Sequence, residues 1–175
     1  MGKAITIENY NSNWPKLFKE EKVKLKEILA GMCLAIEHIG STSVEGLGAK
    51  PIIDIAIGVN DLEGVSEFIE PLKRIGYEFV YHKEFPERRF FRKGYWRAGT
   101  HHLHFYRFKG EHWNNQILFR DYLKNHPDAL KEYHQLKVDL AKKFSVDRSS
   151  YTENKAAFIQ NVLQRAKTEE EQCSK

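Results

Sequence analysis

The sequence feature that most constrains the fold is the run PIIDIAIGV at positions 51–59. The run is almost continuously apolar, which is typical of a strand covered on both faces of a sheet. Asp54 interrupts it between Ile53 and Ile55. A carboxylate in a buried strand is costly unless a charged partner or a metal stabilises it. Asp54 is therefore the first candidate site residue.

The remaining pattern predicts a mixed α/β half followed by a helical half. In chain order we expect a helix starting near Asn13, strands over 33–39 and 51–59, a helix over 61–76, and strands over 77–82, 87–93 and 100–108. The last two strands are joined by GYWRAG, which predicts a hairpin. Helices are expected over 112–126 and 127–144, and the capping-box sequence Ser150 to Glu153 predicts that a last helix begins at Ser150.

We therefore expect a mixed α/β fold of α+β type, with helices on a mixed sheet. The predicted parts are an α/β core over 1–110, a helical part packed on it over 111–168, and a polar tail over 169–175. A single domain is expected because no flexible linker lies near residue 110.

Composition narrows the class of protein. Of 175 residues, 41% are hydrophobic and 30% charged, which is typical of a soluble globular chain. The net charge of +4 predicts mild attraction to anions but falls short of a nucleic-acid binder. Cys33 and Cys173 form no disulfide or zinc pattern, and neither a signal peptide nor a membrane span is evident. We expect a cytoplasmic protein without membrane contact, and its oligomeric state is open.

The segment GSTSVEGLGAKP, from Gly40 to Pro51, matches neither a Walker A loop nor a dinucleotide fingerprint. It does place Gly40 and Ser41 at a turn before the strand that carries Asp54. Backbone N–H groups and the Ser41 hydroxyl can hold a phosphate there, with Mg²⁺ between the phosphate and Asp54. The alternative is a plain turn in which Asp54 bonds a neighbouring backbone. Lys50 either neutralises the phosphate or pairs with Glu45.

In the run THHLHFY, the alternation of a strand puts His102 and His104 on one face. If this strand lies beside the one bearing Asp54, an Asp/His/His site results, which suits a transition metal better than Mg²⁺. The alternative is that these histidines bond to phosphate or to Asp54 without a metal.

The basic run ERRFFRKGYWR offers Arg92 and Arg97 as candidate phosphate contacts, since guanidinium forks suit phosphate oxygens. The other cations fit a solvated edge hairpin. Tyr151 and Lys155 share a face of the last helix, and we favour an ordinary helix surface for them over a cover on the site.

The stretch HIGSTSVEGLGAKPIIDI resembles the signature of the GrpB family, which has the nucleotidyltransferase fold. Matching pieces continue in order along nearly the whole chain: NWPKLF at 13–18, RFFRK at 89–93, THHLH at 100–104, FRDYL at 119–123, and Tyr151-Thr152 with Lys155.

In the wider superfamily, a Gly-Ser after the first strand holds nucleotide phosphates, and an Asp-x-Asp/Glu pair on the next strand binds two metals. The resemblance implies these roles for Gly40, Ser41 and Asp54. Ala56 stands where the second carboxylate belongs, which puts the two-metal route in doubt. Glu45 also replaces the proline of the family's Val-Pro-Gly. Glu37, on the preceding strand, is a candidate replacement carboxylate.

The expected function is to bind a nucleotide or other phosphorylated small molecule between the Gly40-Ser41 turn and the 88–104 hairpin. The expected cofactor is a divalent metal (Mg²⁺, Mn²⁺ or Zn²⁺). The expected reaction class is nucleotidyl or phosphoryl transfer, with an incomplete set of carboxylates. The candidate residues are Asp54 for catalysis, Asp54, His102 and His104 for metal, and Gly40, Ser41, Lys50, Arg92 and Arg97 for phosphate. One alternative is an inactive interaction module whose basic hairpin contacts a protein or RNA. Another is hydrolysis at the Asp/His/His centre.

Overall fold

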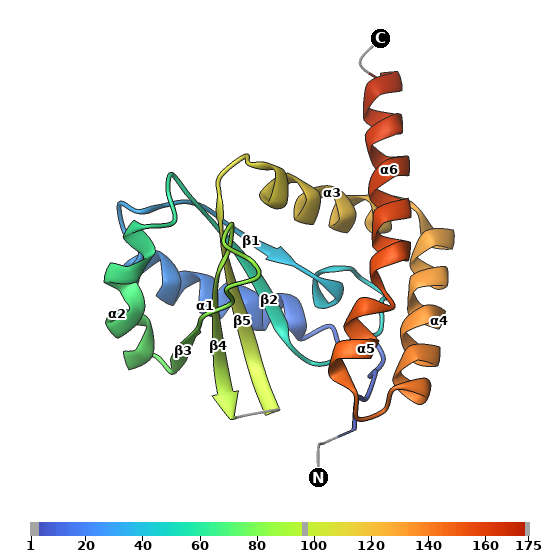
Figure 1. Cartoon of the computed structure of the whole chain (residues 1–175), viewed down its shortest axis with the longest axis horizontal. Helices are drawn as coiled ribbons and strands as arrows, with labels where there is room; N and C mark the ends of the chain where they lie inside the picture. Colours follow the sequence, from blue (N-terminus) through green and yellow to red (C-terminus); the bar gives the residue numbers. More distant parts are fainter. Residues whose placement is uncertain (1–3, 96–97, 174–175) are drawn as a thin grey trace.

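The computed structural model describes residues 4–95 and 98–173 (Figure 1). Its strands are β1 (Cys33–Ile39), β2 (Ile53–Val59), β3 (Tyr77–Val80), β4 (Arg89–Tyr95) and β5 (Ala98–Arg107). They form one sheet in the order β1-β2-β5-β4-β3. The β2–β5 pair is parallel and the other pairs are antiparallel. The predicted hairpin and the predicted mixed α/β class are both confirmed.

The α-helices are α1 (Trp14–Ile28), α2 (Ile69–Arg74), α3 (Glu111–Asn125), α4 (Pro127–Lys143), α5 (Arg148–Glu153) and α6 (Ala156–Cys173). Two short 3₁₀ turns, η1 (Ser41–Ser43) and η2 (Gly64–Phe68), complete the set. Pro15 and Pro127 stand in the first turns of α1 and α4, where the missing N–H costs nothing.

The main core lies on one face of the sheet, beneath α1 and α2. Alternate residues of β2 and β5 point into it, including Ile55, Ile57, Leu103 and Phe105, all fully buried. Leu25 of α1 packs in the same cluster. This alternation places Asp54, Ala56, His102 and His104 on the opposite face.

That opposite face is covered in two ways. At one end, Trp113 and its neighbours on α3 pack over Ala56 and Tyr106. At the other end, α4 and α6 bury Val44 and Leu47 of the Gly-rich segment rather than the sheet itself. Figure 1 shows α4, α5 and α6 beside the β1–β2 side of the sheet, with the end of α6 projecting beyond it. Asp54 therefore lies on the part of this face between the two covered ends, below the Gly-rich segment and the C-terminal helices.

Several boundaries differ from the sequence prediction. The helix predicted over 61–76 is the 3₁₀ turn η2 followed by the short helix α2, and β2 begins at Ile53 rather than at position 51. The last helical region begins earlier than Ser150, because the Asp147 side chain caps α5 by accepting from the Ser150 backbone N–H. The chain then turns and starts α6 at Ala156, which continues through the predicted polar tail to Cys173. Within the described residues, no helix has the length and apolar character needed to cross a bilayer.

Candidate functional site

Asp54 points to the face of the sheet away from the main core, and 28% of its side chain is exposed. Burial would raise the pKa of its carboxyl, but hydrogen bonds from His102 and His104 outweigh that and hold the pKa well below its usual range. Asp54 is therefore a carboxylate that stays ionised at all ordinary pH values.

The parallel pairing of β2 and β5 brings the two histidines to Asp54. Asp54 is in register with His102, and Ala56 with His104. His102 Nδ1 lies 3.2 Å and His104 Nε2 3.0 Å from the same oxygen, Oδ1 of Asp54. The sequence prediction that these strands are neighbours is confirmed, and the three residues converge as expected.

His104 is neutral in this arrangement. Burial lowers the pKa of its ring despite the nearby Asp54 charge. Its other nitrogen, Nδ1, is buried and has no hydrogen-bond partner. We therefore assign its proton to Nε2, from which it is donated to Asp54.

The donor set fits a single metal ion. One oxygen of Asp54 and one nitrogen of each histidine lie within 4.8 Å of one another. Two imidazoles and a carboxylate suit Zn²⁺ or a related transition metal better than Mg²⁺. Because the His104 proton lies on Nε2 and faces Asp54, metal binding through Nε2 would require the other neutral tautomer, with the proton on Nδ1.

The set does not fit two metals. Ala56 offers no ligand, and Glu37, its register partner on β1, is ion-paired with Arg120 at 2.7 Å. Glu37 therefore does not supply the missing carboxylate.

Gly40 and Ser41 form the turn that lies against Asp54. Gly40 has φ +69°, and a Cβ there would lie 2.8 Å from Asp54 Oδ2, so both the conformation and the close approach require glycine. The turn is fixed by Thr42, whose hydroxyl donates to the Ile52 carbonyl 3.1 Å away. Ser41 is left directed toward α4, where its Oγ accepts from Lys137 Nζ at 2.9 Å.

Three lysines converge on the space beside this turn. Lys137 is 2% exposed, and burial with the charges of Lys155 and Lys50 lowers its pKa to about 7. Burial, Lys155 and Arg148 lower the pKa of Lys50 to about 8. Burial also lowers the pKa of Lys155, although Asp54 opposes this. Cations that crowd one another in this way form a strongly electropositive site.

The lysines surround a cavity of about 320 Å³. The lining residues that matter to its chemistry are Ser41, Lys50, Asp54, His102, His104, Lys137, Tyr151 and Lys155. Asp54 is the single carboxylate in the described lining, against three lysines. The ammonium groups of Lys50 and Lys155 lie 4.2 and 4.6 Å from the Tyr151 ring, which provides a cation–π surface between them. The cavity is built to receive an anion.

Sequence reasoning missed one of these residues and preferred the wrong interpretation of two others. Tyr151 is 1% exposed and, with Lys155, lines the cavity, so the predicted ordinary helix surface is wrong. Lys137 was not identified, although a signal exists. It lies four residues after Tyr133 and three before Leu140, on the apolar stripe of α4, where a lysine needs an explanation.

The predicted phosphate contacts fall in different places. Gly40, Ser41 and Lys50 lie at the cavity, and no ion pair joins Lys50 to Glu45, both of which are described residues. Arg92 instead forms an ion pair with Glu78 at 2.7 Å on the exposed part of the sheet and does not line the cavity. Arg97 lies outside the described residues.

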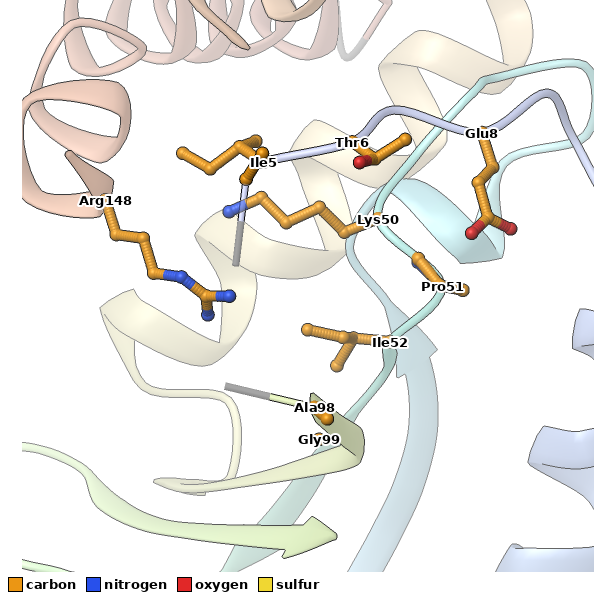
Figure 2. Close-up of a pocket in the computed structure, with 10 residues that line it drawn as sticks. Ile5, Thr6, Glu8, Lys50, Pro51, Ile52, Ala98, Gly99 and Arg148 are labelled. Carbon is orange, nitrogen blue, oxygen red and sulfur yellow. The ribbon is translucent and has the colours of Figure 1, made fainter. Parts of the chain in front are cut away.

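A smaller cavity of about 160 Å³ adjoins the first across Lys50 and Ile52, which line both. Figure 2 shows the Lys50 and Arg148 side chains reaching into it, with Ile5 of the N-terminal segment above them. Its charged lining residues are Lys50, Arg148 and the carboxylate Glu8.

Comparison with known proteins shows the same family in a family model, in curated relatives and in a solved structure. The family model described as GrpB protein matches residues 4–165. The chain is 39% identical to the UPF0157 protein YqkA of Bacillus subtilis over 94% of its own length, but it spans only 48% of that relative. It is 37% identical to the glutamate-rich protein GrpB of Alkalihalophilus pseudofirmus, covering 91% of this chain and 94% of that protein.

A crystal structure of the conserved protein GrpB from Enterococcus faecalis superposes with a TM-score of 0.85 at 38% identity, covering 92% of this chain and 96% of the other. A more distant relative, named dephospho-CoA kinase in Mycobacterium bovis, is 28% identical over 88% of this chain and 44% of its own length.

Proposed function

The chain belongs to the GrpB family, and from its cavity we propose that it binds a nucleotide or another phosphorylated small molecule at the site of Ser41, Asp54 and the three lysines. One observation carries this proposal. Lys50, Lys137 and Lys155 line one cavity with a single carboxylate among its described residues. Uncompensated buried charge costs free energy, so such a cluster is favoured where an anion completes it.

A phosphate group fits better than a generic anion because of how the donors are arranged. The Gly40-Ser41 turn offers a hydroxyl, and the ammonium groups approach from α4, from the segment between α5 and α6, and from the segment before β2. Ammonium and hydroxyl donors are common phosphate partners. The volume of about 320 Å³ lies at the lower end of the range for small-molecule sites, which suits a mononucleotide or a smaller phosphorylated metabolite.

Asp54, His102 and His104 would hold one divalent metal beside the phosphate. When bound, the metal would polarise a phosphoryl oxygen and offset its charge. The reaction class that fits is phosphoryl or nucleotidyl transfer. Because Ala56 replaces the second carboxylate, a two-metal route is not part of the proposal.

The kinase activity named for the distant mycobacterial relative is not transferred to this chain. The match covers 44% of that relative, and this chain has no Walker A sequence.

The alternative function as an interaction module also receives little support. In its basic hairpin, Arg92 is ion-paired with Glu78 and Lys93 with Glu21, and Arg89 donates a hydrogen bond to the Pro86 carbonyl.

The test is thermal unfolding with a panel of nucleotides and phosphorylated metabolites, each with and without Zn²⁺, Mn²⁺ or Mg²⁺. A ligand at a hundredfold excess over its Kd adds about 2.7 kcal/mol, which raises Tm by roughly 5–10 °C for a chain of this size. We expect Lys155→Met to abolish the ligand shift and Asp54→Ala to abolish its metal dependence.

The matched control is Lys142→Met, which removes an exposed lysine from α4. It should leave the shift as in the wild type. If no phosphorylated compound raises Tm, or if Lys142→Met weakens the shift as much as Lys155→Met, the proposal is wrong.

A further inference from the structure

We propose that Ser41 is a nucleophile and Lys137 its base, so that the protein transfers a phosphoryl group from its anionic ligand to the Ser41 hydroxyl. The inference rests on the proposed ligand site, because the ligand supplies the phosphoryl group. It assigns Ser41 a covalent role beyond holding phosphate.

The geometry of the pair supports proton transfer. Ser41 Oγ and Lys137 Nζ are 2.9 Å apart, and Lys137 also donates to the Gly48 carbonyl. The Tyr133 hydroxyl forms a further hydrogen bond with Ser41. Ser41 is partly exposed toward the cavity while Lys137 is buried behind it. Both residues line the cavity, and Ser41 is the more exposed of the two.

The three hydroxyls of the turn have different partners. Thr42 donates to the Ile52 carbonyl and Ser43 to the Gly40 carbonyl, at 3.1 and 2.5 Å. Both therefore fix the turn through the backbone. The Ser41 hydroxyl instead contacts a lysine and faces the cavity, which is the arrangement that a nucleophile requires.

The surroundings of Lys137 favour its neutral form. The ammonium groups of Lys50 and Lys155 oppose its charge, and the nearest carboxylate of the cavity, Asp54, is engaged by His102 and His104. Tyr151 lines the same cavity, and the ring of Tyr133, 4.8 Å from Lys137 Nζ, offers a cation–π contact that the burial of Lys137 outweighs. With its pKa lowered to about 7, Lys137 is a neutral amine in a substantial fraction of molecules near pH 7.

When Lys137 loses a proton, its hydrogen bond with Ser41 can reverse. Nζ then still donates to the Gly48 carbonyl, and its lone pair accepts the Ser41 hydroxyl proton. Serine–lysine pairs are known variants of the nucleophile–base arrangement.

The step is balanced without an added reagent. Ser41 Oγ forms a bond to phosphorus, and the bond from phosphorus to the leaving group breaks. The leaving group departs with the electron pair, and the Ser41 proton moves to Lys137 Nζ. Lys50 and Lys155 offset the charge on the phosphoryl oxygens.

The probe is acetyl phosphate, a small anion whose phosphoryl group is transferred with acetate as the leaving group. The full chain is incubated with it at several pH values, and phosphoserine is located and quantified by peptide mass spectrometry. We expect phosphorylation at Ser41 and not at Ser43, with a rate about tenfold higher at pH 8 than at pH 6, as the amine loses its proton.

Two lysine substitutions separate a base from a structural contact. Lys137→Arg keeps a charged donor that cannot be deprotonated, and Lys137→Met removes the group. Both should lower the phosphorylation rate about a hundredfold and abolish its pH dependence. Unfolding curves verify that each variant is folded, and a folded Lys137→Arg alone suffices for the test.

Absence of phosphoserine at Ser41 in the folded wild type overturns the inference, and so does a Lys137→Arg variant that reacts as fast as the wild type. Ligand-induced stabilisation without phosphoserine would overturn this inference alone and leave the proposed binding function standing. Failure of both measurements would overturn both.

Discussion

Glu21 and Lys137 are each only 2% exposed, and they are the two charged residues that the described part of the chain buries. Glu21 on α1 has every partner that a buried carboxylate needs: Lys93 Nζ at 2.7 Å, the Tyr77 hydroxyl at 3.0 Å and Lys24 Nζ at 3.2 Å. Lys137 on α4 has a serine, a carbonyl and two other lysines nearby. The two residues are therefore equally buried, but Glu21 is surrounded by opposite charge and hydrogen-bond donors, whereas Lys137 is surrounded by like charge.

The contrast teaches how to separate a structural charge from a site charge. A buried ion that is fully paired needs nothing more, whereas one surrounded by like charge is incomplete without an external counter-ion. The same distinction holds between two described regions, since Arg92 and Lys93 of the hairpin are ion-paired with Glu78 and Glu21, whereas the three lysines of the cavity share one carboxylate. Partners, rather than the density of basic residues, identify the site.

The largest expected effect is on the paired charge. Glu21→Ala leaves Lys93 and the Tyr77 hydroxyl without their partner beneath α1, which should lower the free energy of unfolding by roughly 3–5 kcal/mol. Urea denaturation measures it. A loss below 1 kcal/mol would mean that the Glu21 contacts do not stabilise the fold and would remove one side of the comparison.

Lys137→Met should behave in the opposite way. Its effect on the free energy of unfolding should stay within about 1 kcal/mol at pH 7, because the lost hydrogen bond to Gly48 is offset by removal of an uncompensated charge. Affinity for a phosphorylated ligand should fall by about 1.5–3 kcal/mol, or more than tenfold. Urea denaturation and calorimetric titration measure the two quantities, and unchanged affinity would place Lys137 outside the site.

The two buried charges should also respond to opposite ends of the pH scale. The pKa of Lys137 is about 7 in the folded protein and 10.5 when unperturbed, so the unfolded state binds more protons between these values. Stability should therefore rise with pH in that window, by at most about 1.4 kcal/mol per pH unit from this group. Lys137→Met should lose that rise, which urea denaturation at pH 7 and pH 9.5 measures.

For Glu21 the sign is the same, but the window is acidic. Burial raises the pKa of its carboxyl, but the hydrogen bond and charge of Lys93 outweigh burial and lower the pKa below its ordinary value of 4.5. Its stabilisation is present above that value and is lost as the pH falls through the lower folded pKa. A wild type and Glu21→Ala that lose stability in parallel below pH 4 would contradict this assignment.

The smallest effect is expected at the exposed pair. Arg92 binds Glu78, whose side chain is 66% exposed. Arg92→Met should change the free energy of unfolding by less than about 1 kcal/mol and ligand affinity by less than about twofold. Calorimetric titration of Arg92→Met and Lys155→Met side by side measures the affinities. A tenfold loss of ligand affinity for Arg92→Met would show that the hairpin contributes to the site.

Local patterns of the sequence determined most of the fold. The apolar run around Asp54, the β-prone hairpin and the helical periodicity after residue 111 each predicted the right type of element, with strand boundaries that differ by up to two residues. The parallel neighbourhood of β2 and β5, which the Asp/His/His site requires, was an expectation that the register confirms. Short motifs were also sufficient to recognise the family resemblance, because the residues of each motif are contiguous in the sequence.

What the tertiary structure alone decided is which cations gather at the site. Ser41 and Lys137 are separated by 96 residues yet share a hydrogen bond, and Lys50 and Lys155 meet across the ring of Tyr151. Charge density along the sequence favoured Arg92 and Arg97, because a cluster of basic residues is visible without knowledge of their partners. Whether a charge is paired depends on the surroundings of its last few atoms, and helix packing fixes those surroundings only after the chain has folded.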